Sequence, residues 1–255
     1  MNIAKTAFLS ITFVVASGLL IACNPKPDRK ALTIMNINPA WQQQPIVCHE
    51  AITIQNEQWK LQYLRFYLSD FKLNQQPQLL TITPWQQPGL ALLGTDCHGN
   101  DNWQLTFAEP LAPGQLSFTL GLPFAINHQN PLTAISPLNF SEMFWSWQLG
   151  YKFLRLDMQG PDYGWAFHLG STGCQSASVL RPPALPCRAV NTFEVTLDYQ
   201  PNQKLQLNLA ALLSDIVLSQ QNSCMSDSLQ TSCQRLFDNL TLTAPWKLSP
   251  ASSAP

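Results

Sequence analysis

Two of the four histidines and three of the eight tryptophans of this 255-residue chain lie between residues 128 and 174. The imidazoles of His128 and His168 suit copper, and a thioether such as that of Met143 favours the cuprous state. A Trp-x-Trp pattern begins at Trp145, although such a pattern more often fills a sandwich core. Because no acidic cluster accompanies the histidines, these residue types fit Cu(I) better than Mg, Ca or a hydrolytic zinc.

The same residues also have purely structural explanations. Met143 and either histidine could simply pack or form hydrogen bonds in a core or a turn. His49 and His98 each follow a cysteine directly, so both are weaker ligand candidates. His49 ranks above His98 because its loop can reach the same end of a sandwich.

The cysteines are expected to form disulfides. Of the seven, Cys23 lies at the end of an export signal, and the other six form an even set, which in an exported protein indicates disulfide bonds. A thiolate metal site would need close CxxC pairs, and the sequence has none. Pairing of nearest neighbours would join Cys48 with Cys97, Cys174 with Cys187, and Cys224 with Cys233, although six cysteines allow 15 connectivities.

The first residues resemble a bacterial lipoprotein signal. One early lysine, an apolar run and small residues before Cys23 predict a signal peptide over residues 1–22 and a lipidated Cys23. A generic signal or a membrane anchor is the alternative, but the apolar run is shorter than the ~20 residues of a spanning helix. Residues 23–30 would be a tether. Asn24 favours anchoring at the outer membrane, with the protein facing the periplasm.

Composition restricts the remaining possibilities. Charged residues make up 11% and the net charge is −1, so the chain has no basic footprint for nucleic acid. Residues 31–248 are long for one domain but within the range of single β-sandwiches. We expect one such domain, followed by a disordered tail over residues 249–255.

Short alternating apolar runs separated by Gly, Pro, Asn and Asp predict an all-β fold. We expect a β-sandwich with long loops and one or two short helices, stapled by disulfides. Helices are predicted over NLAALLSDIVLSQQ from Asn208 and SCQRLF from Ser232. The run EMFWSWQLGYKFLRLD predicts one long strand with Met143, Trp145 and Trp147 on one face. The run WAFHLG predicts a strand carrying His168, and His128 falls in a loop. The expected strand runs cover residues 32–37, 46–54, 58–73, 79–83, 103–107, 115–120, 143–157, 165–168, 193–197, 204–209 and 240–248.

Several motifs together resemble the MbnP family, described as the four-cysteine half of a metallo-mystery pair. They are NH-x-x-PL, PLN, M-x-W-x-W-Q-x-GYKFLR-x-D and HLGSTGC, with LRFYLSDFKL upstream and LNLAALL downstream. The resemblance extends from about Leu61 to Leu240. The insertion QSASVLRPPALP after Cys174 departs from the family pattern.

The resemblance implies a copper-binding protein of copper homeostasis rather than an enzyme. Its implied partner is MbnH, a di-haem enzyme of the MauG and cytochrome c peroxidase superfamily. Carried over to this sequence, Trp145 is the residue oxidised to kynurenine, and copper binding depends on that change. His128 and His168 lie inside matching motifs and are the implied ligands.

Two other functions remain to be tested. A serine hydrolase could use Ser171 with His168 in HLGSTGC, but the G-x-S-x-G elbow is absent and no aspartate is marked as the third member. A surface binding module without metal is the other alternative.

Overall fold

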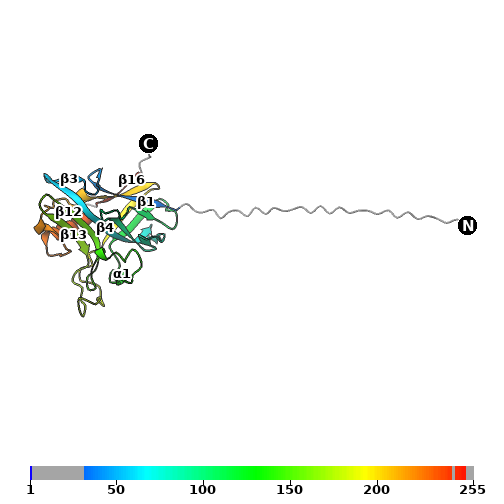
Figure 1. The fold of residues 1–255 in the computed structure, drawn as a ribbon. Helices are drawn as coiled ribbons and strands as arrows, with labels where there is room; N and C mark the ends of the chain where they lie inside the picture. Colours follow the sequence, from blue (N-terminus) through cyan, green and yellow to red (C-terminus); the bar gives the residue numbers. More distant parts are fainter. Residues whose placement is uncertain (2–31, 243–244, 251–255) are drawn as a thin grey trace. The chain divides into compact units, whose positions relative to one another are not determined.

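A five-stranded sheet forms one layer of the fold in the computed structural model, which describes residues 1, 32–242 and 245–250. β1 (Ile34–Trp41) runs parallel to β15 (Gln203–Asn208), and β16 (Trp246–Pro250) pairs antiparallel with β15. The short strands β2 (Gln44–Pro45) and β9 (Gln104–Thr106) pair with β1. The strands in this layer therefore come from both ends of the described domain (Figure 1).

The second sheet has 11 strands and is centred on β4 (Glu57–Leu73). β4 pairs with β12 (Gly150–Gln159), β7 (Leu90–Thr95) and β10 (Gly114–Leu120). β12 also pairs with β11 (Phe144–Ser146) and β13 (Gly164–Gly170), which places β13, β12 and β4 side by side (Figure 1). The remaining strands are β3 (Ala51–Ile54), β5 (Gln76–Pro77), β6 (Gln86–Gln87), β8 (Asp101–Asn102) and β14 (Phe193–Tyr199).

Aromatic side chains join the two sheets. The ring of Trp246 in β16 lies 5.4 Å from that of Phe66 in β4 and 5.6 Å from that of Phe118 in β10, measured between centroids. All three side chains are almost fully buried, and aromatic rings bury more apolar area than other side chains do. The predicted all-β sandwich is confirmed.

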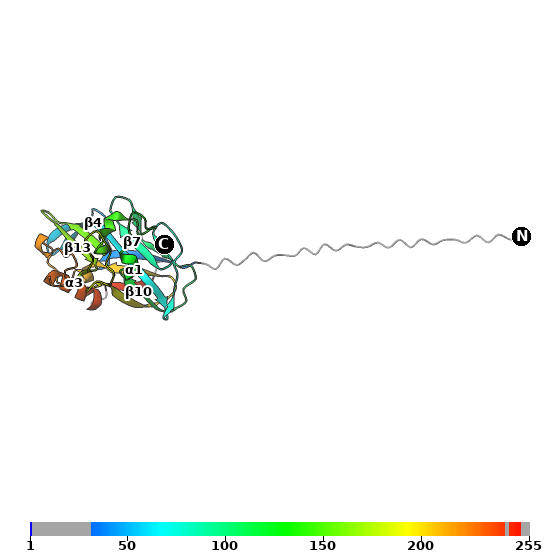
Figure 2. The ribbon, with the colours of Figure 1, turned by 90° about the horizontal axis from the view of Figure 1, so that it is seen from below.

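The outer face of β4 is also covered, which explains why most of this strand is buried. Tyr67 donates its hydroxyl hydrogen to the carbonyl of Pro137, and Ser69 donates to the carbonyl of Gly121. The covering segment contains α1 (Phe124–Asn127) and the 3₁₀ helix η1 (Ser141–Met143). Seen from below, α1 lies between β13 on one side and β7 and β10 on the other (Figure 2).

The predicted helix from Asn208 is wrong beyond its first turn. Asn208 does cap a helix, because its side-chain oxygen accepts hydrogen bonds from the backbone N–H groups of Ala210 and Ala211. α2 nevertheless ends at Leu212, and Asp215 adopts a left-handed φ of 58°, which a helix cannot continue through. The predicted piece from Ser232 is longer than expected, since α3 spans Thr231–Leu242; η2 (Gln220–Asn222) is a single 3₁₀ turn.

The predicted single strand from Glu142 is also wrong. Met143 belongs to η1, β11 covers only three residues, and the chain turns back at Gly150 to start β12. Gly150 has a φ of +81°, and a Cβ there would lie 2.3 Å from the carbonyl oxygen of Asn127. A glycine is therefore required at this turn. The strict alternation of Met143, Trp145 and Trp147 on one face does not hold.

Three further boundaries differ from the prediction. β7 was not expected, because its six residues are all buried and show no alternation. The run predicted over residues 240–248 contains the end of α3 and the start of β16, and residues 79–83 form only isolated bridges. The predicted tail begins too early, because β16 continues to Pro250. The predicted signal peptide, the lipidated Cys23 and the tether lie outside the described residues.

Disulfides join the cysteines as nearest neighbours along the chain. The pairs are Cys48 with Cys97, Cys174 with Cys187, and Cys224 with Cys233. The last pair connects α3 to the segment that runs beside β13, where the N–H of His168 donates to the carbonyl of Cys224. Among the described residues, no helix has the length and apolar character needed to cross a bilayer.

Candidate metal centre

Trp145 lies in β11, at the edge of the larger sheet, and its side chain is partly buried. Its ring packs against that of His168 in β13, with 6.4 Å between the centroids and 49° between the planes. Gly170 lies under the indole, since a Cβ at that position would come within 2.7 Å of Cζ3 of Trp145. The strand order β11–β12–β13 therefore sets the tryptophan beside the histidine.

His168 is held by a carboxylate on the neighbouring strand. Its Nε2 lies 2.7 Å from Oδ1 of Asp157, and Arg155 donates from Nε to Oδ2 of the same carboxylate at 2.7 Å. Because a carboxylate only accepts, Nε2 carries the proton and Nδ1 of the neutral ring keeps its lone pair. Metal-binding histidines in proteins are typically oriented by such an outer hydrogen bond.

The environment of Asp157 keeps this carboxylate ionised. Burial alone would raise the pKa of Asp157, but the hydrogen bond from His168 and the charges of His168 and Arg155 outweigh it. The pKa of Asp157 is therefore lower than the usual value for an aspartate. An ionised Asp157 can fix the orientation of His168 throughout the neutral pH range.

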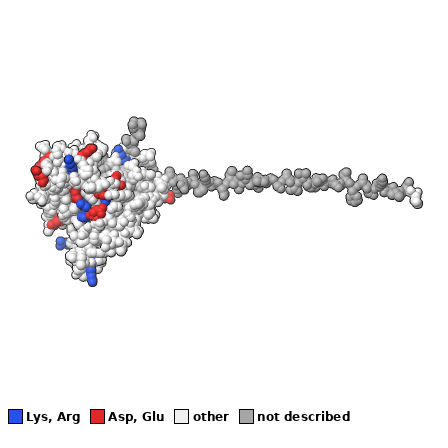
Figure 3. All heavy atoms as spheres, in the orientation of Figure 1, with Lys and Arg blue, Asp and Glu red and all other residues white. Residues whose placement is uncertain are grey.

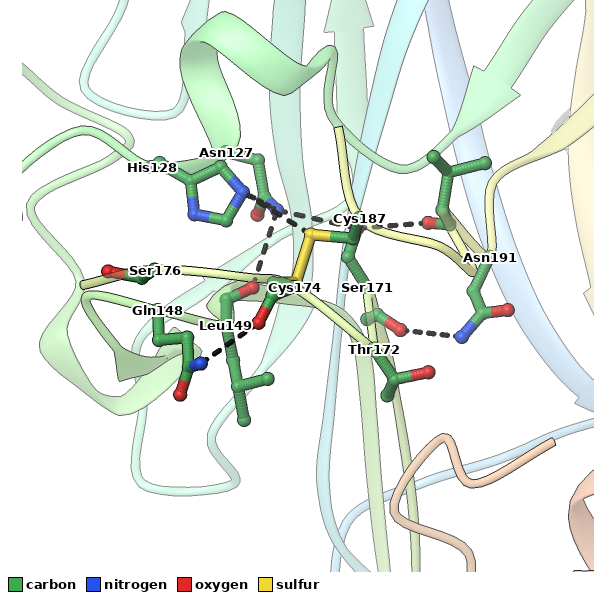
Figure 4. The surroundings of a disulfide bond; sticks show 12 residues. Asn127, His128, Gln148, Leu149, Ser171, Thr172, Cys174, Ser176, Cys187 and Asn191 are labelled. Atoms are coloured by element: carbon green, nitrogen blue, oxygen red, sulfur yellow. Dashed lines mark hydrogen bonds between the residues drawn. A yellow bond between two sulfur atoms is a disulfide. The ribbon is translucent and has the colours of Figure 1, made fainter. Parts of the chain in front are cut away.

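His128 caps the end of α1 and is 9% exposed (Figure 4). Its Nε2 lies 3.3 Å from the amide nitrogen of Asn127 and 3.8 Å from Sγ of Cys187. Its Nδ1 is buried and has no hydrogen-bond partner in the described part of the chain. A buried polar atom without a partner is rare in native proteins, and a bound ion is one of its ordinary explanations.

Burial also lowers the pKa of His128, and the nearby backbone of Trp147 opposes this only weakly. Desolvation disfavours the charged imidazolium, so the ring stays neutral. A neutral imidazole is the form that binds a metal. The donor chemistry of His128 therefore fits a metal ligand.

Asn127 connects the elements around His128. Its Oδ1 accepts from the N–H of Tyr151 at 2.8 Å, and its Nδ2 points toward the carbonyl of Leu149 and Oγ of Ser171. These contacts tie the end of α1 to the β11–β12 turn and to the end of β13 (Figure 4). Sequence reasoning missed this residue, although it belongs to the same NH dipeptide as His128.

The segment Trp145–Ser146–Trp147 reaches both predicted histidines. The indole of Trp145 packs on His168, and the backbone of Trp147 lies next to His128. The side chain of Trp147 packs edge-on against Phe144, at 5.9 Å between centroids. A three-residue segment therefore contacts His168 at its first residue and His128 at its last.

Two cysteines also approach His128 but are committed to a covalent bond. The donor atoms of His128, Cys174 and Cys187 lie within 4.8 Å of one another. The two sulfur atoms form a disulfide bond, 2.01 Å long, so neither is a thiolate that could bind a metal. The cysteines hold the loop beside His128, as Figure 4 shows.

The weaker ligand candidates lie elsewhere. Met143 is fully buried in the hydrophobic core, which favours a packing role. His49 contacts the carbonyl of Cys97 and the ring of His98, next to the Cys48–Cys97 disulfide. Neither residue is among the contacts described above for His128 and His168.

Ser171 is arranged for structure rather than for nucleophilic attack. Its hydroxyl donates to the carbonyl of Val190 at 3.0 Å and faces the amide of Asn127 at 3.5 Å. The imidazole that a serine hydrolase would need, that of His168, is bonded to Asp157 instead. This geometry does not activate Ser171 as a nucleophile.

A charged cluster surrounds the Asp157 carboxylate on the outer face of β4 and β12, and Figure 3 shows charged side chains gathered there. The side chain of Arg65 is fully buried and pairs with Glu142 at 2.6 Å and with Asp96 at 3.3 Å. Arg155 stacks on the Tyr63 ring at 3.9 Å. Sequence reasoning missed this cluster, although the low overall charge makes each charge in the LRFYLSDFKL and GYKFLRLD runs notable.

Comparisons with known proteins agree with this fold. A model of the MbnP family matches residues 30–226. A solved structure, MbnP from Methylosinus trichosporium, has a TM-score of 0.71 and covers 81% of this chain and 87% of its own. The sequence identity is 23%, so this likeness shows the fold. A search of curated proteins found no match.

Proposed function

Because the chain belongs to the MbnP family, we propose that it is a copper-binding lipoprotein of the bacterial cell envelope, activated by oxidation of Trp145 to kynurenine. His128 and His168 hold the metal as Cu(I). The oxidant is a partner di-haem enzyme of the MbnH type, so this chain is the substrate of a maturation reaction and not itself an enzyme. Its lipid at Cys23 anchors it to the outer membrane, facing the periplasm.

The observation that carries the proposal is the position of Trp145–Ser146–Trp147 between the two histidines. The first residue of this segment packs on His168 and the backbone of the last lies at His128. A chemical change at Trp145 therefore alters a group that touches one ligand directly. The same change reaches the other ligand through only two peptide bonds.

The two histidines also suit Cu(I) individually. Nδ1 of His168 keeps a lone pair because Nε2 is bonded to Asp157, and Nδ1 of His128 is buried without a partner. Imidazole is compatible with copper, and Cu(I) tolerates few ligands. Copper bound here would be held by nitrogen donors and shielded from bulk water by the surrounding segments.

Oxidation converts Trp145 from an apolar ring into a polar one. Two oxygen atoms are added across the Cγ–Cδ1 double bond, which breaks, and hydrolysis then releases the formyl carbon as formate. Peroxide reduced to water at the partner's haems supplies the oxygen and takes up the electrons. The product carries an aryl amine and a ketone, both of which can interact with a metal or its ligands.

The accessibility of Trp145 favours this residue over a core tryptophan as the oxidised one. Trp145 is partly buried at a sheet edge, whereas Trp59 and Trp165 are each only 1% exposed. An enzyme that oxidises a protein residue must bring its electron acceptor close to that residue. The edge strand β11 gives it a surface to approach.

The ligand assignment can be tested by measuring copper retained against a strong Cu(I) chelator after co-expression with the di-haem partner. We expect wild type and His98→Gln to retain one copper per chain, while His128→Gln and His168→Gln each lose it. Circular dichroism and thermal unfolding check that each variant is folded. Retention of copper by folded His128→Gln and His168→Gln would refute the assignment, and lack of copper in the modified wild type would favour a metal-free binding module.

A further inference from the structure

A second pair of histidines lies beside the Cys48–Cys97 disulfide. The chain places His49 directly after Cys48 and His98 directly after Cys97, and the disulfide holds the two cysteine Cα atoms 5.4 Å apart. The two imidazole centroids are 6.4 Å apart, with 80° between the ring planes. Both histidines are exposed. The covalent bond therefore presents two imidazoles side by side at the surface.

Each of these rings uses one nitrogen to bond a backbone carbonyl. Nε2 of His49 lies 2.9 Å from the carbonyl oxygen of Cys97, and Nδ1 of His98 lies 2.6 Å from that of Asp96. Because a carbonyl only accepts, these nitrogens carry the protons. Nδ1 of His49 and Nε2 of His98 then hold the lone pairs of the neutral rings. This is the arrangement in which metal-binding histidines are commonly found.

The backbone around the pair is fixed in an uncommon conformation. His49 and Cys97 have φ values of 65° and 58°, in the left-handed region that non-glycine residues rarely adopt. Oδ1 of Asp96 accepts the N–H of His98 at 2.8 Å, and Arg65 holds the Asp96 carboxylate. The two imidazoles are thus attached to a braced loop, while their exposed side chains remain free to adjust around an ion.

The surroundings leave room for an ion with water ligands. An open hollow of about 340 Å³ adjoins the disulfide, and Asp101 contributes a carboxylate to its lining. Glu50, the residue after His49, is also exposed. These oxygen donors lie in the same region as the two imidazoles and add negative charge that favours a cation.

We propose that His49 and His98 form a second metal site, exposed at the surface, that binds Cu(II) through two imidazoles. Imidazole ligands suit Cu, Ni and Zn, and among divalent ions of the first transition row Cu(II) binds most tightly to such donors. This site does not require modification of Trp145 and shares no ligand with the proposed Cu(I) site. It would take up copper reversibly at the surface of the same protein.

The test uses the chain expressed without the di-haem partner, in which Trp145 is intact. Isothermal titration with Cu(II) should give one site per chain in wild type. Because two fixed imidazoles bind as a chelate, loss of either should weaken Cu(II) binding by on the order of 100-fold. His49→Gln and His98→Gln should show this loss equally, and the double variant should be little weaker than either single variant.

Electron paramagnetic resonance of the Cu(II) complex gives an independent measurement. Wild type should show hyperfine structure from two equatorial nitrogens, and each single variant should show fewer. His128→Gln is the matched control and should bind Cu(II) as wild type does. The proposal is overturned if one of the two single variants keeps wild-type affinity, or if His128→Gln removes the Cu(II) site. Failure of the Cu(I) site would leave these results unchanged.

Discussion

The indole of Trp145 and the imidazole of His168 are in ring contact, with centroids 6.4 Å apart and planes inclined by 49°. His168 is in turn fixed by Asp157, and Asp157 by Arg155. A chain of contacts therefore leads from the tryptophan proposed for oxidation to a buried charge cluster on β4 and β12. This chain couples the state of Trp145 to the orientation of a proposed copper ligand.

Replacing Gly170 by alanine should displace Trp145. The new Cβ would lie 2.7 Å from Cζ3 of Trp145 and 2.8 Å from the carbonyl oxygen of Tyr151, and the second atom is backbone that cannot easily move. Overpacking of this kind typically costs about 1–3 kcal/mol of stability. We expect urea denaturation to show that loss, and the partner-dependent copper content to fall.

Gly164→Ala is the matched control for this substitution. Gly164 opens the same strand, β13, but a Cβ there would meet nothing closer than 3.6 Å. It should keep wild-type copper content. An equal fall in copper content for both alanine variants would mean that β13, rather than the position of Trp145, is being perturbed.

Replacing Asp157 by asparagine should weaken the proposed copper site without removing a ligand. Loss of such an outer partner typically costs about 10- to 100-fold in metal affinity. The variant should also change the acid stability curve. The pKa of Asp157 is lowered in the folded state, so its stabilising contribution is present above its unfolded pKa of 3.8 and is lost as pH falls through the folded value.

Urea denaturation from neutral to acid pH measures this contribution. In Asp157→Asn the loss of stability on acidification should be smaller than in wild type. The copper affinity can be measured on the same protein by chelator competition. Wild-type copper affinity in the folded asparagine variant would show that His168 does not depend on Asp157 for its orientation.

Lys152 should make stability rise with pH in the alkaline range. Burial, and then repulsion by Arg155, lowers its pKa from 10.5 to about 8. Between these values the unfolded chain keeps the proton that the folded chain has lost, so the free energy of unfolding increases with pH. The measurement should stop near pH 10, where unfolded tyrosines begin to ionise.

Lys152→Met removes the titrating group while keeping a long apolar stem. Its free energy of unfolding should therefore change less between pH 8 and pH 10 than that of wild type. The buried ammonium donates to the carbonyl of Glu142 at 2.8 Å, so part of any stability gain in the variant would be offset by the lost hydrogen bond. Identical slopes in the two proteins would contradict the lowered pKa.

The sequence was sufficient to predict the sandwich, because alternating runs and the even cysteine set are local signals. The hairpin formed by Trp145, Gly150 and β12 was not predicted, although Gly150 marked the turn. Its left-handed φ is required by the close approach of Asn127, a residue 23 positions earlier in the chain. Such a tertiary contact leaves no periodic signal in the sequence.

The candidate site shows the same division. His128, His168 and Trp145 could be singled out by residue type and motif, but Asp157 was not. Once the turn between β12 and β13 is known, the register pairs Asp157 with Ala166 and Arg155 with His168. The carboxylate then lies diagonally across from the imidazole on the same face. Residue types were available from the sequence, whereas the partner depended on the register.

The most direct test of the central claim compares the chain expressed with and without its di-haem partner. The measurement is copper per chain after chelator competition, together with peptide mass at Trp145, in wild type and in Trp145→Phe. We predict one retained copper only in partner-treated wild type, whose Trp145 peptide has gained one oxygen atom and lost one carbon atom. Equal copper content with and without the partner, or copper retained by Trp145→Phe, would contradict the account.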